Sequence, residues 1–155
     1  MLRLFVAVFL AASLGLGGAP VLKGQTTSYE DNALRIENQR GDMLVVRGAN
    51  GNPVGKIGVF RGLDLAGLVA SSEKATAEAR KFTRNYKPGT LLASAGIATL
   101  GLALGVGRIQ DVNAGITIGL TLTGIGLVTY GAGRLEDAYN ALERSFWWYN
   151  HDLKH

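Results

Sequence analysis

Side chains that could do chemistry are few in this 155-residue chain. It contains no cysteine, and its two histidines, His151 and His155, both lie at the C-terminus. A thiolate nucleophile, a disulfide and a zinc–thiolate site are therefore excluded, and a histidine base would have to act from a terminal tail. The acidic residues Glu136, Asp137 and Glu143 are expected on the solvated face of a helix rather than in a carboxylate pair. We expect no catalytic residue, no metal and no cofactor.

Two short motifs suggest binding functions, but both are better explained as turns. Arg40-Gly-Asp42 spells an adhesion tripeptide, and residues 48–55 are rich in glycine. The glycines lack the Gly-Lys-Ser/Thr ending and the following helix of a phosphate-binding loop. The chain is weakly basic, with 16 Lys and Arg against 12 Asp and Glu, and its cations are scattered. We therefore predict no nucleic-acid partner.

The first 19 residues have the layout of a secretory signal peptide. Arg3 is followed by an apolar run over residues 4–16 and by the small residues Gly17, Gly18 and Ala19. A helix over this run would reach only about 20 Å, which is short for a bilayer core of roughly 30 Å. We predict cleavage near residue 19, with an uncleaved anchor as the alternative. The protein is then exported to the cell envelope.

The elements that follow predict an α+β fold. Short β-like runs at residues 34–37, 43–46 and 54–60 are separated by turns, so residues 25–64 are expected to form a small antiparallel meander. A helix capped by Asp64 should then run from Leu65 to about Tyr86, where Pro88-Gly89 would end it. Residues 65–155 form the predicted helical region.

Residues 90–107 and 114–133 form two charge-free apolar segments joined by a six-residue connection. As helices they would measure about 27 Å and 30 Å, close to the bilayer core. We predict an antiparallel, membrane-spanning helical hairpin over residues 90–133. A β-hairpin, suggested by the alternation at residues 116–123, and a soluble helix pair buried in a core are the alternatives.

Small residues recur along one stripe of each segment and predict where the helices pack. Because glycine lets helix backbones approach closely in lipid, we expect these residues to form a contact within the hairpin or with a second chain. The predicted helix-packing residues are Ser94, Ala98, Gly101 and Gly105 in the first segment and Gly115, Gly119, Gly126 and Gly133 in the second.

The charges at the ends of the hairpin oppose the direction of export. Arg80, Lys81, Arg84 and Lys87 precede the first apolar segment, whereas the connection holds Arg108 and Asp111. The positive-inside tendency places basic flanks in the cytoplasm, but a cleaved signal places these outside it. Which membrane the hairpin would enter therefore stays open.

Residues 134–150 have the periodicity of an amphipathic helix that ends in four aromatic residues. Phe146, Trp147, Trp148 and Tyr149 are consecutive, so they cannot all face one core. They are expected either at a membrane interface or partner surface, or with Phe146 and Tyr149 in the core and the tryptophans over the sheet.

The apolar segments with Gly101, Gly105, Gly115, Gly119 and Gly126 resemble the glycine-zipper two-helix hairpins of small bacterial envelope proteins. The resemblance covers residues 90–133. The glycine runs are sparser than in that family, and no lipid-modified cysteine is present. It implies membrane association or a role in envelope integrity, and no catalytic residue.

The sequence thus predicts an exported, non-enzymatic envelope protein that packs with itself or with another envelope protein at a membrane. The alternative is a soluble secreted protein that binds a ligand or peptide and buries the hairpin in its core. An enzyme is the least supported class, because no nucleophile–base pair or metal cluster is evident.

Overall fold

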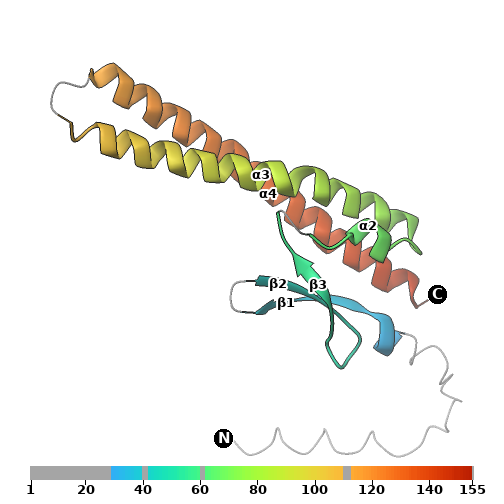
Figure 1. Cartoon of the computed structure of the whole chain (residues 1–155). Helices are drawn as coiled ribbons and strands as arrows, with labels where there is room; N and C mark the ends of the chain where they lie inside the picture. Colours follow the sequence, from blue (N-terminus) through green and yellow to red (C-terminus); the bar gives the residue numbers. More distant parts are fainter. Residues whose placement is uncertain (1–28, 40–41, 60–61, 110–112, 155) are drawn as a thin grey trace, which may run out of the picture.

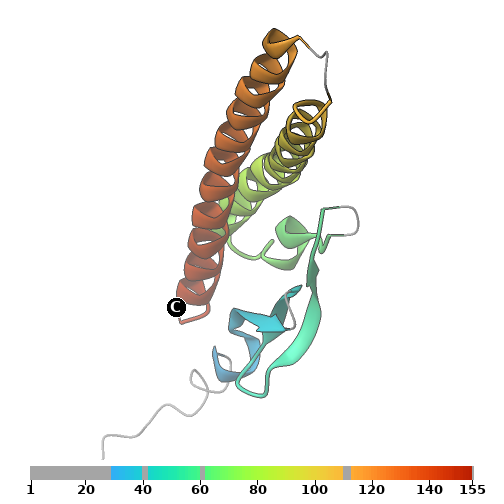
Figure 2. The same ribbon diagram turned by 90° about the vertical axis from the view of Figure 1, so that its left-hand side faces the viewer.

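The computed structural model describes residues 29–39, 42–59, 62–109 and 113–154. The predicted signal peptide and the Arg40-Gly41 part of the adhesion-like tripeptide lie outside these residues. The described chain is an α+β structure in which a three-stranded sheet precedes two long antiparallel helices (Figure 1). Figure 2 shows that the sheet lies beside one half of the helix pair, while the other half extends away from it.

The sheet confirms the predicted meander. Its strands are β1 (Leu34–Gln39), β2 (Asp42–Arg47) and β3 (Asn52–Ile57), paired antiparallel in the order β1-β2-β3. Gly48 and Gly51, in the turn between β2 and β3, have φ values of 73° and 67°. Residues that carry a side chain rarely adopt such positive φ values. The turn therefore explains why Gly48 and Gly51 are glycines, without a role in binding phosphate.

The helix predicted from Leu65 to Tyr86 is two helices. Asp64 does cap the first, α2 (Leu65–Leu68), by accepting a hydrogen bond from the Gly67 amide at 3.0 Å. The chain then turns, and Ser72 caps α3 (Glu73–Val106) by accepting from the Ala75 amide at 3.3 Å. Ser72 thus provides a hydrogen-bond acceptor for a free amide at the start of a second helix. The chain therefore forms two helices here instead of the predicted continuous one.

Pro88-Gly89 does not end α3, contrary to the prediction. Proline inside a helix costs about 3 kcal/mol, but here the next residue packs directly on the partner helix. A Cβ added at Gly89 would lie 3.2 Å from the Gly131 carbonyl oxygen and 3.1 Å from the Leu135 nitrogen. Tertiary packing on both sides of Pro88 thus overrides its local preference.

The second apolar segment and the aromatic segment are one helix, α4 (Ala114–Asp152). Asn113 caps it by accepting from the Gly115 amide at 2.8 Å. The hairpin predicted over residues 90–133 is present, but its arms continue without interruption into residues 73–87 and 134–152.

These two continuations, the sheet and α2 make up what we call the head. Its core joins the sheet to both helices through Leu34, Val45, Ile57, Leu65, Val69, Ala75, Ala79, Phe82, Ala138, Ala141, Leu142, Phe146 and Tyr149. Two polar contacts add to this packing. The buried Ser145 hydroxyl donates to the Ala75 carbonyl at 2.9 Å. The Asn150 side chain accepts from the Leu34 amide and donates to the Leu34 carbonyl, both at 2.8 Å.

Candidate membrane-interaction site

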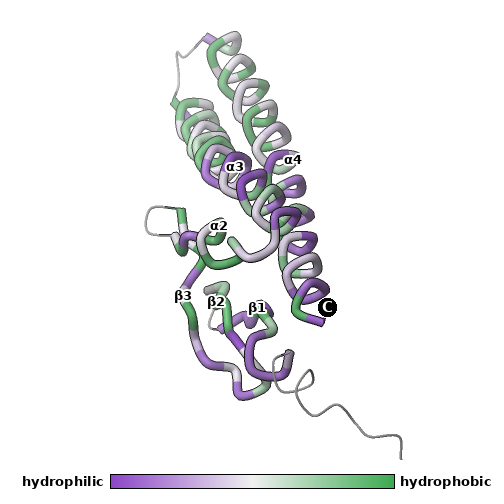
Figure 3. The backbone as a smooth tube through the Cα atoms, turned by 90° about the vertical axis from the view of Figure 1, so that its right-hand side faces the viewer, coloured by the Kyte–Doolittle hydropathy of each residue, from purple (hydrophilic) through white to green (hydrophobic). Residues whose placement is uncertain are grey.

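The part of the helix pair outside the head is charge-free and carries its large side chains on the outside. We call it the apolar half: residues 88–107 of α3 and 114–133 of α4. Of the twelve large hydrophobic residues that are exposed in the described chain, ten lie between Leu91 and Tyr130. They are Leu91, Ile97, Leu102, Leu104, Ile109, Ile116, Ile118, Leu122, Ile125 and Tyr130. Figure 3 shows the contrast, with a mostly green and white apolar half and a head rich in purple.

Both arms have the dimensions of a membrane span. Twenty residues of helix reach about 30 Å, which equals the hydrocarbon core of a typical bilayer. By length and composition, α3 and α4 are each able to cross a membrane. Water-soluble monomers rarely expose an apolar surface of this extent, so the outer surface of the apolar half is the strongest candidate for a functional surface.

The two helices touch through small residues spaced seven apart. On α3 these are Gly89, Gly96 and Ala103, and on α4 they are Gly124, Gly131 and Ala138, all buried. The repeat continues into the head at Phe82 and Ala75 on α3 and at Ser145 on α4. A seven-residue repeat keeps one seam of each helix facing its partner.

The glycines of this seam bring the backbones into direct contact. A Cβ added at Gly131 would lie 2.5 Å from the Ala93 nitrogen, and one at Gly96 would lie 2.7 Å from the Val128 nitrogen. A Cβ at Gly124 would meet the Leu100 side chain at 2.7 Å. Backbone atoms cannot move aside cheaply, so the close approach requires glycine at positions 96 and 131.

The eight residues predicted to pack the helices lie elsewhere. Ser94, Ala98, Gly101, Gly105, Gly115, Gly119, Gly126 and Gly133 are all exposed. A Cβ added at Gly101, Gly105, Gly119, Gly126 or Gly133 would meet nothing within 4 Å, and one at Gly115 would meet only its helix cap. They therefore do not form the contact between α3 and α4. A contact with a second chain through them stays a prediction.

Charged and aromatic residues mark the boundary between the apolar half and the head. Lys87 is the last charged residue of α3 before the apolar half, and Arg134 is the first of α4 after it. The Arg134 guanidinium donates to the Asn85 side-chain oxygen at 2.9 Å and to the Tyr130 hydroxyl at 2.8 Å. Tyr130 is exposed, and a tyrosine at this level suits a membrane–water interface. The sequence interpretation missed Tyr130, although its place within one turn of the first charge was visible.

The predicted aromatic site divides between core and surface. Phe146 and Tyr149 are buried in the head, as the core interpretation expected. Trp148 is partly buried against the core of the head, and the Lys74 ammonium lies over its ring, 4.1 Å from the centroid. Trp147 is 58% exposed and stacks on His151. It lies about 20 Å along α4 beyond Gly133, so a partner contact, rather than the membrane boundary, stays the prediction for this residue.

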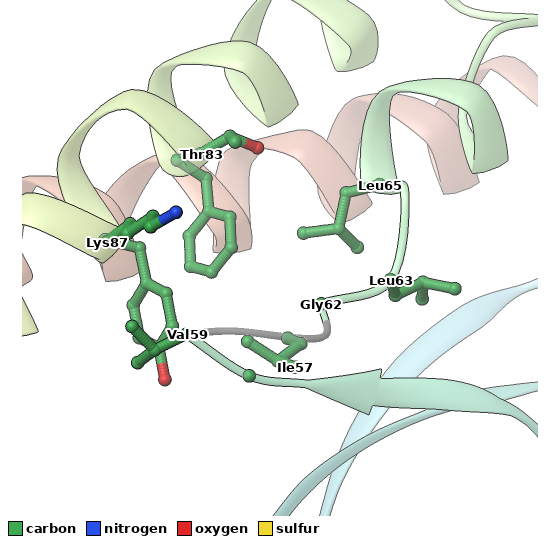
Figure 4. A pocket seen from close by; sticks show the side chains of 10 residues that line it. Ile57, Val59, Gly62, Leu63, Leu65, Thr83 and Lys87 are labelled. Atoms are coloured by element: carbon green, nitrogen blue, oxygen red, sulfur yellow. The ribbon is translucent and has the colours of Figure 1, made fainter.

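A cavity of about 180 Å³ lies between the end of β3 and α3 (Figure 4). Ile57, Leu63, Leu65 and Phe82 contribute apolar walls, and Thr83, Tyr86 and Lys87 line its α3 side. Burial, and to a lesser extent the nearby Tyr139, raises the pKa of the Tyr86 phenol. Ligand pockets usually measure about 300–1,000 Å³, so this cavity has room for a group the size of one ring at most.

Several ionisable groups of the described chain pair with opposite charges rather than gathering around a metal site. Glu78 lies between Lys81 and Arg144, with its second oxygen 3.4 Å from the Arg144 guanidinium. Its charge is thus balanced by two cations. Among the residues that the structure describes, no three acidic or histidine side chains come together to hold a metal ion.

Comparisons with protein-family models, with curated proteins and with solved structures give no match. Function is therefore inferred from the distribution of charge, burial and exposure in the chain itself.

Proposed function

We propose that this chain is an exported, non-enzymatic protein of the bacterial cell envelope. Its apolar half inserts into a membrane as a helical hairpin, and its α+β head stays in the aqueous phase at the surface. Its role is structural or one of interaction, through the head or through the outer faces of the hairpin.

The observation that carries this proposal is the reversal of side-chain placement along one helix pair. In the apolar half the glycines of the seam, Gly89, Gly96, Gly124 and Gly131, face inward, whereas most of the exposed large hydrophobic side chains of the described chain lie on its outer surface. Eight of the exposed Leu and Ile residues lie within the two spans. On an insertion scale each contributes about −0.3 to −0.6 kcal/mol, or roughly −2 to −5 kcal/mol in all. In water the same surface is unfavourable.

Membrane insertion also accounts for the glycine seam. Lipid tails are as apolar as leucine, so helices in a bilayer gain little from burying large side chains against each other. Close backbone packing supplies the attraction instead. The contacts of Gly96 and Gly131 provide such packing between the two spans.

Export is supported by the layout of residues 1–19. In this arrangement the head lies on the outer side of the membrane, and the connection that contains Arg108 lies on the opposite side. Because Arg80, Lys81, Arg84 and Lys87 then remain outside, the signal must dominate over the positive-inside tendency.

The outer stripe of small residues is the proposed contact with a second chain. Gly101 and Gly105 on α3 and Gly119 and Gly126 on α4 leave shallow, exposed strips between the large apolar side chains. A second copy or another envelope protein can approach there, as in the glycine-zipper hairpins that this segment resembles. The alternative, a soluble binding protein, requires the hairpin to be buried within the chain, whereas its outer surface is exposed.

The deciding experiment combines membrane extraction with site-specific labelling. We expect the full chain to stay in membranes washed with alkaline carbonate; its release into the supernatant would contradict the proposal. Because the chain has no cysteine, a Ser71→Cys variant reports the head and an Ala114→Cys variant reports the far end of the hairpin. In spheroplasts, a membrane-impermeant maleimide should label the first and should reach the second only after permeabilisation. The opposite pattern would reverse the orientation.

A further inference from the structure

Four cations lie on α3 immediately before the apolar half. Arg80, Lys81, Arg84 and Lys87, which we call the basic collar, are all exposed. Of these, Lys81 pairs with Glu78, and the other three form no ion pair within the part of the chain that the structure describes. No residue between Glu78 and Val106 on α3 is acidic. The collar is thus a concentrated positive charge on one helix.

The position of the collar matches the depth of lipid headgroups. From Arg80 to Lys87 the helix rises about 10 Å, and Lys87 directly precedes the start of the apolar half at Pro88. With the apolar half in the hydrocarbon core, Lys87 and Arg84 therefore lie at the level of the headgroup layer, which is roughly 5–8 Å thick on each side, and Lys81 and Arg80 lie just beyond it, within reach of their long side chains.

The opposite helix has a different charge at this depth. The close approach of Gly89 to Arg134 and Leu135 sets the level of α4 beside the collar. Glu136 and Asp137 follow there, exposed and without an ion pair to the collar among the described residues. Glu136 and Asp137 thus stay separate from the collar, and the α3 side of the boundary is the basic one.

Lys87 adds a further feature, because it lies at the cavity described above. Figure 4 shows Lys87 and Thr83 projecting from α3 on the side that faces Ile57 and Leu65. Its ammonium group therefore stands at the edge of an apolar hollow as well as at the start of the apolar half. The apolar walls exclude part of the water around the Lys87 ammonium group. The lower local dielectric constant would strengthen the electrostatic attraction between this group and a phosphate.

We propose that the basic collar binds the headgroup phosphate of anionic phospholipids in the leaflet on the side of the head. This inference rests on the proposed insertion of the apolar half. Clusters of Lys and Arg next to a membrane span attract anionic lipids through their summed charge, and the attraction falls with salt. The collar would fix the depth of the hairpin and enrich acidic lipids around it.

The test uses the full chain in neutral detergent, titrated with fluorescent phosphatidylglycerol and, separately, phosphatidylcholine. We expect tighter binding of phosphatidylglycerol at low salt. An R80Q/R84Q/K87Q variant should lose this preference. Each cation near an anionic surface contributes about fivefold, so three correspond to a loss on the order of a hundredfold, which shrinks at high salt. All three positions are exposed, so the variant should keep the helical circular dichroism of the parent chain.

The matched control is an R35Q/K56Q/K154Q variant, which removes the same charge from the sheet and the C-terminus. It should retain the lipid preference. Equal preference in the two variants, or none in the parent chain, would overturn the proposal. Displacement of phosphatidylglycerol by millimolar inorganic phosphate would also overturn it, because the site would then recognise free phosphate. If the parent chain shows no preference for phosphatidylglycerol but still resists carbonate extraction, the collar proposal alone is refuted and the proposed function stays in place.

Discussion

The head and the apolar half are built from the same two helices, but they place large side chains on opposite sides of the seam. In the head, Phe82, Leu142 and Phe146 face inward and most charged residues face outward. In the apolar half, Gly96, Gly124 and Gly131 face inward, and residues such as Leu104, which is 72% exposed, face outward. The seven-residue repeat runs through both parts. The head therefore has a surface suited to water and the apolar half a surface suited to an apolar environment. The helix geometry is the same in both.

The largest expected difference is between truncating a leucine in the head and truncating one in the apolar half. Leu142 is 1% exposed in the head core, so Leu142→Ala should lower the free energy of unfolding by about 2–5 kcal/mol. Leu104→Ala should change it by less than about 0.5 kcal/mol and should instead weaken membrane partitioning. Denaturant unfolding of the detergent-solubilised chain measures the first effect, and vesicle flotation measures the second. Equal destabilisation by the two variants would remove the distinction between the halves.

The next effect compares a seam glycine with an outward glycine. In Gly131→Ala the new methyl group meets backbone atoms of Ala93 and Gly89 at 2.5–3.0 Å, so the helices must separate, at a cost of about 1–3 kcal/mol. Gly126→Ala meets nothing within 4 Å and should stabilise the isolated chain by up to about 1 kcal/mol. Thermal unfolding followed by circular dichroism should show shifts of opposite sign. A second chain packed on Gly126 would appear as loss of self-association in the same variant.

The contrast expected for the link between the sheet and α4 is smaller, because its control variant is close to neutral rather than stabilising. Asn150→Ala removes two hydrogen bonds to the backbone of Leu34 and should cost about 1–3 kcal/mol. Asn140→Ala, on the exposed face of α4, is the matched control and should be close to neutral. Hydrogen exchange of the Leu34 amide should accelerate only in the first variant. Unchanged protection of that amide would show that the sheet does not depend on Asn150.

The smallest expected effect is a dependence of the stability of the head on pH in the acid range. A hydrogen bond from Ser72, followed by contacts with His151 and Lys74, lowers the pKa of the Asp152 carboxyl below its usual value near 3.8. Stability from this group is thus complete above the usual pKa and is lost as pH falls through the lowered one. Unfolding midpoints between about pH 5 and 2 should decline less steeply in Asp152→Asn than in the parent chain. The apolar half, which has no carboxyl or histidine side chain, should not respond in this range.

Local patterns predicted the strands, the turn at Gly51 and the two apolar arms, because turn chemistry and the absence of charge are readable residue by residue. The contact between the arms was not predicted. Small residues occur on more than one face of each helix, and the sequence interpretation followed Gly101, Gly105 and Gly119 instead of Gly96 and Gly131. The signal that could have identified the seam is its seven-residue spacing, which continues into the head. The expected stop at Pro88 concealed that continuity.

The unbroken course of α4 has a mechanical consequence. Residues 134–150 extend about 25 Å beyond the apolar half along a single helix axis. Helices in bilayers commonly tilt by about 20° and adjust this angle to the local thickness. Over such an arm, a change of that size moves Asn150 by roughly 9 Å relative to the bilayer normal. Since Asn150 holds the first strand, the sheet would travel with it in the proposed membrane arrangement, so that a change in bilayer thickness would displace the aqueous end of the chain.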